Sequence, residues 1–219
     1  MSHTTEIVIT DGMLSALREG LKTKMSGFRL AHTLGVEEMA ARIGEIYCPE
    51  KLNVIRAAAL LHDITKELSP KAQKEIFEKH GVEMSEDLKS SPPTQHAITA
   101  ALEIPLRYPE FASDEVIGAV RCHTTGRVDM TLCEKIVYLS DYIDFTRTYS
   151  DCKALREMFW SADLKSMGEA EKEEHLDKVV LRSLELTIAD LAENSRHISR
   201  ETIEARDALL KKYGKIQEK

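Results

Sequence analysis

The chain has 219 residues, enough for one sizeable hydrophobic core. Its 42% hydrophobic and 31% charged content is that of an ordinary globular protein, and its net charge of −7 argues against a nucleic-acid-binding surface. No run of about 18 apolar residues predicts a membrane span, and the start of the chain lacks the basic and apolar segments of a signal peptide. Because the four cysteines include no Cys-x-x-Cys pair, we expect reduced, packed thiols in a cytoplasmic protein, without a structural zinc site.

Apolar residues recur with helical period in nearly every segment of the first half of the chain. The first predicted helix follows an N-cap at Thr10 or Asp11. A short helix opens at Pro70 and stops at Gly81, before a predicted loop over 90–94. The longer helices carry three apolar stripes: Met13, Leu14, Leu17 and Leu21; Phe28, His32, Val36, Met39, Ala40 and Ile43; Leu52, Ile55, Ala59 and Leu60.

The second half of the chain continues the helical pattern. We expect helices over 95–106 and 132–145, and between them a helix capped at Ser113 or Asp114 that leads to His123. Two or three further helices fill 151–214, the last starting within 199–202. The only strand-like segment, 7–9, is too short to build a sheet. The sequence therefore predicts a single all-α domain over residues 1–219, with roughly eight to ten helices.

Four histidines and two aspartates lie at the inner face or the end of a predicted helix. His62 and Asp63 directly follow an apolar run, where two polar groups are unfavourable unless something pairs with them. A neutral imidazole and an ionised carboxylate are both good ligands for a divalent first-row metal. One such histidine is more often a satisfied core residue than a ligand, but six residues of this kind in one small domain weaken that interpretation. The set is His32, His62, Asp63, His96, His123 and Asp141.

Taken in order, these residues resemble the HD phosphohydrolase superfamily, an all-helical and metal-dependent group. Five blocks are similar to the YqeK family within it: residues 29–36, 57–66, 96–97, 123–126, and 135–143 with Arg147. Members of that family are bacterial hydrolases that cleave diadenosine tetraphosphate symmetrically into two ADP. The resemblance covers about residues 15–150, which would form the HD core. It implies that the helices of 151–219 complete a nucleoside pocket.

The resemblance also implies a metal site made by His32, His62, Asp63 and Asp141. This mixed nitrogen and oxygen set suits iron, manganese, cobalt or zinc, and the family favours iron. Such an ion lowers the pKa of bound water from about 15.7 toward roughly 7. The expected nucleophile is therefore a metal-bound hydroxide, whose proton Asp63 or Asp141 accepts.

Two histidines at 96 and 123 have two roles open to them. They either hold a second ion or contact phosphate, and phosphate contact is the favoured role. One ion is thus expected, with a second ion as the alternative. The nucleotide site would include His32, His96, His123 and Asp141.

Cationic side chains beside the histidines predict phosphate binding. Lys66 lies one helical turn after His62 and can neutralise a phosphate as a point charge, which makes it a catalytic candidate. Arg29 and Arg147 are candidates for bidentate phosphate clamps.

Two segments that follow helices are further candidates. Thr124 and Thr125 offer hydroxyl and backbone N–H groups to an anion, although the same residues also suit a plain helix C-cap before Gly126. Near the end of the chain, family members shape the nucleoside pocket with a turn and a final helix. In this sequence the turn contains Ser195, Arg196, His197 and Ile198.

The leading hypothesis is a hydrolase acting on a small nucleotide, diadenosine tetraphosphate, with no nucleic-acid or membrane partner. The alternatives are another HD-type nucleotide or deoxynucleotide phosphohydrolase, or a nucleotide-binding HD protein without catalysis. The absence of Walker, Gly-x-Gly-x-x-Gly and Gly-x-Ser-x-Gly patterns excludes kinase, dehydrogenase and serine-hydrolase interpretations. The sequence is compatible with a homodimer.

Overall fold

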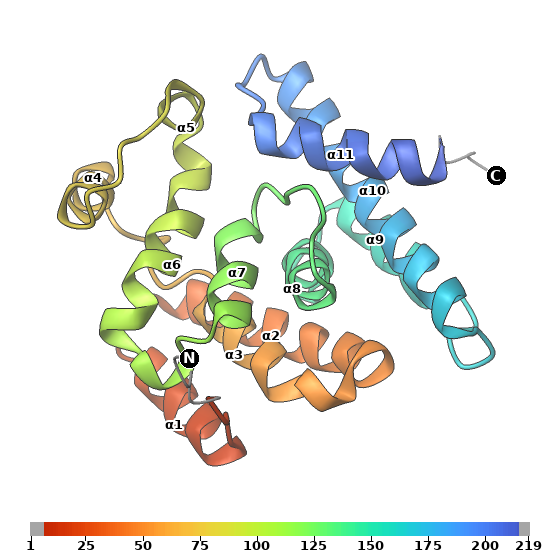
Figure 1. Cartoon of the computed structure of the whole chain (residues 1–219), viewed down its shortest axis with the longest axis horizontal. Helices are drawn as coiled ribbons and strands as arrows, with labels where there is room; N and C mark the ends of the chain where they lie inside the picture. The colour runs from red at the N-terminus through yellow and green to blue at the C-terminus, as the bar shows by residue number, and fades with distance from the viewer. Residues whose placement is uncertain (1–6, 215–219) are drawn as a thin grey trace, which may run out of the picture.

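The computed structural model describes residues 7–214, which form eleven α-helices and three short 3-10 helices and contain no strand (Figure 1). The predicted all-α class is confirmed, with one helix more than the expected range. The α-helices are α1 (Asp11–Leu21), α2 (Gly27–Tyr47), α3 (Leu52–Leu61), α4 (Pro70–Lys79), α5 (Glu86–Ser90), α6 (Gln95–Arg107), α7 (Asp114–Cys122), α8 (Leu132–Ile143), α9 (Ser150–Trp160), α10 (Glu169–Glu193) and α11 (Arg200–Tyr213). The 3-10 helices are η1 (Pro49–Lys51), η2 (Pro92–Thr94) and η3 (Pro109–Phe111).

Most helix starts follow from a capping residue in the sequence. The hydroxyl of Thr10 accepts a backbone N–H in the first turn of α1, and Ser113 does the same for α7. α8 begins with a capping box, in which Thr131 and Glu134 each accept a backbone N–H of the other. Pro70 occupies the first turn of α4, where its missing N–H costs nothing. The predicted starts of these helices are confirmed.

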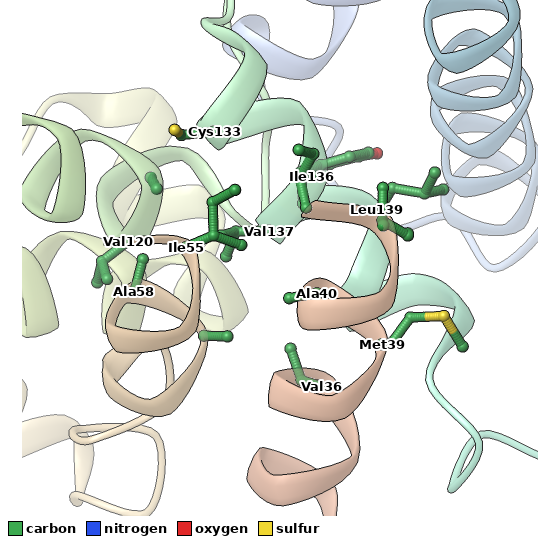
Figure 2. Close-up of a cluster of buried hydrophobic side chains, with 14 of the residues drawn as sticks. Val36, Met39, Ala40, Ile55, Ala58, Val120, Cys133, Ile136, Val137 and Leu139 are labelled. Atoms are coloured by element: carbon green, nitrogen blue, oxygen red, sulfur yellow. The ribbon is translucent and has the colours of Figure 1, made fainter. Parts of the chain in front are cut away.

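Helix α3 lies at the centre of the bundle and packs against α2, α7 and α8. The alanines at 57–59 are 0% exposed, and their small side chains let the neighbouring helices come close. Gly44 of α2 has the same effect, because a Cβ there would lie 3.1 Å from Cδ1 of Ile55. Figure 2 shows apolar side chains of these four helices facing one another. The apolar run of α3 is therefore a helix buried on every side, and its end carries His62 into the interior.

The predicted loop over 90–94 is wrong in part. Its first residue ends the short helix α5, and Pro92 then opens η2. Helices of five and three residues are too short to leave a periodic apolar pattern in the sequence.

The predicted apolar stripe of α2 is wrong at its first position. Phe28 is 80% exposed, whereas the stripe from His32 onward is buried. The buried residues of α2 begin at His32, and in the first turn Leu30 packs against the core while Phe28 points away from it.

Helices α9, α10 and α11 fill the C-terminal part, as expected, and α10 packs against α8, α9 and α11 (Figure 1). The first turn of α11 also contacts α5, because Asp87 accepts hydrogen bonds from the Arg200 N–H at 3.2 Å and the Ser199 hydroxyl at 3.2 Å. The division into an HD core and completing C-terminal helices stays a prediction.

The structure bears on two further predictions, one about the cysteines and one about membrane spans. All four cysteines are free and buried. Within residues 7–214, no helix combines the length and the apolarity that crossing a membrane requires.

Candidate metal centre

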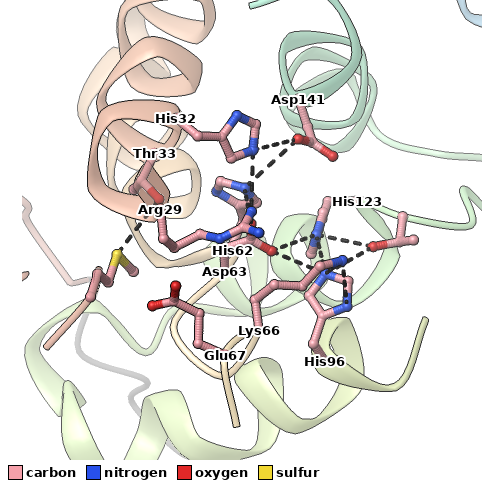
Figure 3. Close-up of polar contacts among 12 residues, drawn as sticks. Arg29, His32, Thr33, His62, Asp63, Lys66, Glu67, His96, His123 and Asp141 are labelled. Atoms are coloured by element: carbon pink, nitrogen blue, oxygen red, sulfur yellow. Dashed lines mark hydrogen bonds and ion pairs between the residues drawn. The ribbon is translucent and has the colours of Figure 1, made fainter. Parts of the chain in front are cut away.

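The six histidine and aspartate side chains singled out in the sequence converge in the interior (Figure 3). They come from α2, the end of α3, the start of α6, the end of α7, and α8. Five are at most 5% exposed, and the side chain of the sixth, Asp141, is 19% exposed. The structure thus brings together residues that are up to 109 positions apart in the sequence: His32, His62, Asp63, His96, His123 and Asp141.

Asp63 occupies the middle of this cluster, with its two carboxylate oxygens facing different histidines. Oδ2 lies 3.3 Å from Nε2 of His62 and 3.8 Å from Nε2 of His32. Oδ1 lies 3.1 Å from Nε2 of His96 and 3.8 Å from Nε2 of His123. The carboxylate therefore joins two pairs of imidazoles.

Asp141 approaches the first of these pairs. Its Oδ1 lies 2.9 Å from Nε2 of His32 and 3.9 Å from Nε2 of His62. Two sets of three residues place their ligand atoms within 4.8 Å of one another, close enough to share an ion: His32, His62 and Asp141; and His62, Asp63 and His123.

Three of the histidines are held in one orientation by their own helix ends. At positions 62, 96 and 123, Nδ1 lies 2.7–2.8 Å from the backbone oxygen three residues earlier. Because a carbonyl oxygen only accepts, each Nδ1 carries the proton and each Nε2 of the neutral ring keeps its lone pair. Histidines that ligate metals are commonly oriented in this way.

The resulting set of acceptors fits a cation. Nε2 of His96 lies 3.0 Å from Nε2 of His123 and 3.1 Å from Oδ1 of Asp63. Burial lowers the pKa of His96, and lowers that of His123 to about 3, so both rings are neutral at pH 7. The buried Nε2 of His62 has no hydrogen-bond partner in the described chain, and Nε2 of His32 faces the carboxylate of Asp141 at 2.9 Å. Lone pairs that face one another across such distances repel unless a positive ion lies between them, so the donor set fits a divalent metal.

The carboxylates of the cluster are ionised. Burial alone would raise the pKa of Asp63, but His62 and His96 outweigh it and hold the pKa well below the ordinary value. For Asp141 the partial burial is likewise outweighed, by Arg147 and His32. Two ionised carboxylates, with the neutral imidazoles of His96 and His123, give the charge that a divalent ion needs. Burial lowers the pKa of His32, but hydrogen bonds to Asp141 and Asp144 outweigh it and raise the pKa to about 9, so this ring must release a proton when it ligates an ion.

Asp144 completes the cluster from behind, and the sequence reasoning missed it. Its Oδ2 lies 3.3 Å from Nδ1 of His32, and it is 0% exposed. The backbone N–H of Thr146 donates to Oδ1 at 2.7 Å. Gly35 makes room for this carboxylate, because a Cβ there would lie 2.8 Å from Oδ1. The only sequence signal is that Asp144 follows Asp141 by three residues, a spacing that does not reveal its partner.

The three predicted phosphate-binding cations surround the same cluster. Arg29 forms an ion pair with Asp63, and Nη2 of Arg147 lies 2.6 Å from Oδ1 of Asp141. Nζ of Lys66 lies 3.3 Å from an imidazole nitrogen of the cluster, and burial lowers the pKa of this ammonium group. All three cations therefore lie where a polyanion at the centre would meet them.

The two predicted threonines point to different places. The Thr124 hydroxyl lies 3.0 Å from Nε2 of His123, at the cluster. The Thr125 hydroxyl donates to Oε2 of Glu201 at 2.8 Å and so ties this turn to α11. Gly126, with φ of +66°, ends the turn in a conformation that other residues rarely adopt. Glu201 is a second residue that sequence reasoning missed.

A cavity of about 630 Å³ lies between α5, α6, α7 and α11, next to this turn. Its walls include Asp87, Ile98, Ile117, Arg121, Thr125 and Glu201. The residues predicted for the base pocket, Ser195, Arg196, His197 and Ile198, do not line it; the lining of this segment begins at Ser199. His197 is linked to the cavity through Asp87, whose Oδ1 lies 2.7 Å from its Nε2.

Comparison with known proteins agrees with this geometry. A family model described as HD domain matches residues 29–146, more than half of the chain. Three curated relatives are named "Bis(5'-nucleosyl)-tetraphosphatase, symmetrical". The Staphylococcus aureus protein is 31% identical over 141 residues, 64% of this chain and 71% of the relative. The Bacillus subtilis protein is 28% identical over 138 residues (63% and 73%), and the Halalkalibacterium halodurans protein is 24% identical over 195 residues (87% and 93%).

A solved structure shares the whole architecture. The crystal structure described as a predicted HD superfamily hydrolase involved in NAD metabolism, from Clostridium acetobutylicum, superposes with a TM-score of 0.79 at 27% identity. The match covers 94% of this chain and 100% of that one. With its sequence blocks, helical fold and histidine–aspartate cluster, the chain belongs to the HD domain family of metal-dependent hydrolases and, within it, to the YqeK-like group.

Proposed function

We propose that this protein hydrolyses diadenosine tetraphosphate symmetrically to two molecules of ADP. The observation that carries the proposal is the cluster of buried acceptors around Asp63, bordered by the three cations Arg29, Lys66 and Arg147. Such an arrangement supports a site for a metal ion together with a phosphate chain. The name shared by the three relatives supplies the class of substrate and the position of the cut.

The metal would be held by His32, His62, Asp63 and Asp141, with iron as the favoured ion. When bound, a divalent ion polarises a phosphoryl oxygen and lowers the pKa of a coordinated water toward neutrality. A second ion at His96 and His123 is supported by the way that Asp63 offers one oxygen to each pair of histidines.

The side chains of the protein would handle charge and protons. Arg29 and Arg147 present planar guanidinium groups that can each take two phosphate oxygens. Lys66 offers its charge to the leaving phosphate, and its lowered pKa makes its proton easier to give up. Asp63 or Asp141 would accept the proton of the attacking water at a carboxylate oxygen, and the greater exposure of Asp141 supports it as the acceptor.

One nucleoside would occupy the cavity between α5, α6, α7 and α11. A volume of about 630 Å³ is within the usual range of about 300–1,000 Å³ for small-molecule sites. Ile98 and Ile117 give apolar walls for a base, and the carboxylates of Asp87 and Glu201 can accept hydrogen bonds from ribose hydroxyls. In this way α11 would complete the pocket, as the prediction for 151–219 requires.

A product assay tests the proposal. Purified protein is incubated with iron(II) or manganese(II) and diadenosine tetraphosphate, and the nucleotides are separated by chromatography. We expect ADP as the only product, formed at twice the rate of substrate loss. A mixture of AMP and ATP contradicts the symmetrical cut, and a preference for nucleoside triphosphates favours another HD-type phosphohydrolase. Binding without turnover favours the non-catalytic alternative.

A further inference from the structure

Phe28 is an exposed aromatic side chain beside the candidate metal centre. It is 80% exposed, although the sequence places it in the apolar stripe of α2. It precedes His32 by four residues and therefore shares the helix face from which His32 reaches the cluster. Its neighbour Arg29 reaches Asp63. Phe28 thus lies one helical turn before His32, and packing within residues 7–214 does not account for an aromatic side chain there.

The centre has two sides, and one of them leads to the cavity of about 630 Å³ between α5, α6, α7 and α11. On the Oδ1 side of Asp63 lie His123 and Thr124. They belong to the turn whose next residue, Thr125, lines the cavity between α6, α7 and α11. At the Oδ2 side, His32 and Arg29 connect to the first turn of α2. A dinucleoside tetraphosphate carries a base at each end, so the second base needs a different contact.

We propose that Phe28 stacks on the base of the second nucleoside and so favours dinucleoside over mononucleoside substrates. This inference rests on the proposed function. An aromatic ring stacks on a purine without regard to its hydrogen-bonding edge. Arg29 next to Phe28, and Arg147 beside Asp141, supply positive charge for the phosphates that precede the base. An aromatic ring next to cationic side chains suits a nucleotide, whose base can stack on the ring while its phosphates bind the cations.

Steady-state kinetics with diadenosine tetraphosphate test the inference. Phe28→Ala should raise KM by about 5- to 100-fold, the loss of one base stack, with kcat within about twofold of wild type. Phe28→Trp should keep the wild-type KM. The inhibition constant of inorganic tripolyphosphate, which has no base, should not change in Phe28→Ala. An unchanged KM for diadenosine tetraphosphate in Phe28→Ala overturns the inference.

Leu106→Ala is the matched control. Leu106 is also an exposed apolar residue, at 56%, but it lies at the far end of α6 from His96. This variant should show wild-type kinetics. An equal rise of KM in Leu106→Ala would mean that lost surface, not stacking, is responsible, and would also overturn the inference.

A binding measurement separates the inference from the proposed function. In Phe28→Trp, titration with ADP in the presence of manganese(II) should quench the fluorescence of the introduced indole, since a stacked purine quenches it. Wild-type protein, whose single tryptophan is Trp160, gives the background signal. If the wild type does not hydrolyse diadenosine tetraphosphate, the proposed function fails, and this titration still decides the stacking contact. Absence of extra quenching rejects it.

Discussion

Asp63 is the residue on which the candidate centre depends most. It offers both carboxylate oxygens, and each of the four histidines lies within 3.8 Å of one of them. Asp63→Ala should therefore remove bound metal and hydrolysis together, with activity lower by at least about a thousandfold, because both water activation and phosphate polarisation are lost. Metal content by mass spectrometry and the product assay check this.

The control for this substitution is Asp163→Ala, which removes an exposed carboxylate between α9 and α10. It should keep metal and activity. Full hydrolysis by a metal-free Asp63→Ala protein would contradict a metal-dependent mechanism.

Asp144 acts on the centre through His32. Its carboxylate faces Nδ1 of that ring and so fixes the direction of Nε2. Asp144→Asn should lower metal affinity by about 10- to 100-fold, the usual effect of losing an outer partner of a ligating histidine. A titration with manganese(II) or zinc(II) followed by calorimetry measures this. The exposed Asp151→Asn serves as control, and equal affinities in the two variants would refute the positioning role.

At the scale of elements, α11 is held in place by a residue from a different helix. Asp87 of α5 accepts the backbone N–H of Arg200 and the Ser199 hydroxyl, which is the role of an N-cap supplied across space. Asp87→Ala should lower the free energy of unfolding by about 0.5–2 kcal/mol. Urea denaturation measures this loss, and hydrogen exchange should rise first in the opening turn of α11.

Glu86→Ala is the matched control, because Glu86 is on the same short helix and, among residues 7–214, forms its ion pair with the exposed Lys89. Such an exposed pair contributes little. An equal decrease in the free energy of unfolding in the two variants would mean that the substitutions disturb α5 itself and not its contact with α11.

Much of the fold could be predicted because its determinants are local. Thr10, Ser113 and Pro70 each mark the start of a helix that begins within one turn of them. The structure confirms all three starts. The five residues of α5 leave no period, so that helix escaped detection. Phe28 fits the helical period of its stripe, but period alone does not tell where the core ends along a helix.

In the candidate site, the sequence could predict only those residues whose type and local setting indicate metal binding. A histidine beside an aspartate after an apolar run is unusual wherever it occurs, so His62 and Asp63 stood out. Asp144 and Glu201 are ordinary in the sequence. Their partners, His32 and Thr125, lie 112 and 76 residues away, and only the fold brings them together.

For the whole molecule, the centre joins five helices, so metal binding should stabilise the entire fold. Nε2 of His96 lies 3.0 Å from Nε2 of His123 and 3.1 Å from Oδ1 of Asp63, and the buried lone pairs on these atoms repel one another unless an ion lies between them. A metal that binds only the folded chain adds about 2.7 kcal/mol at a concentration 100-fold above Kd. For a chain of this size that corresponds to a rise in Tm of roughly 5–10 °C. Calorimetric melting in EDTA and in excess manganese(II) measures the difference. The same comparison with Asp63→Ala should give no rise, and a rise of equal size in that variant would mean that the ion binds elsewhere on the molecule.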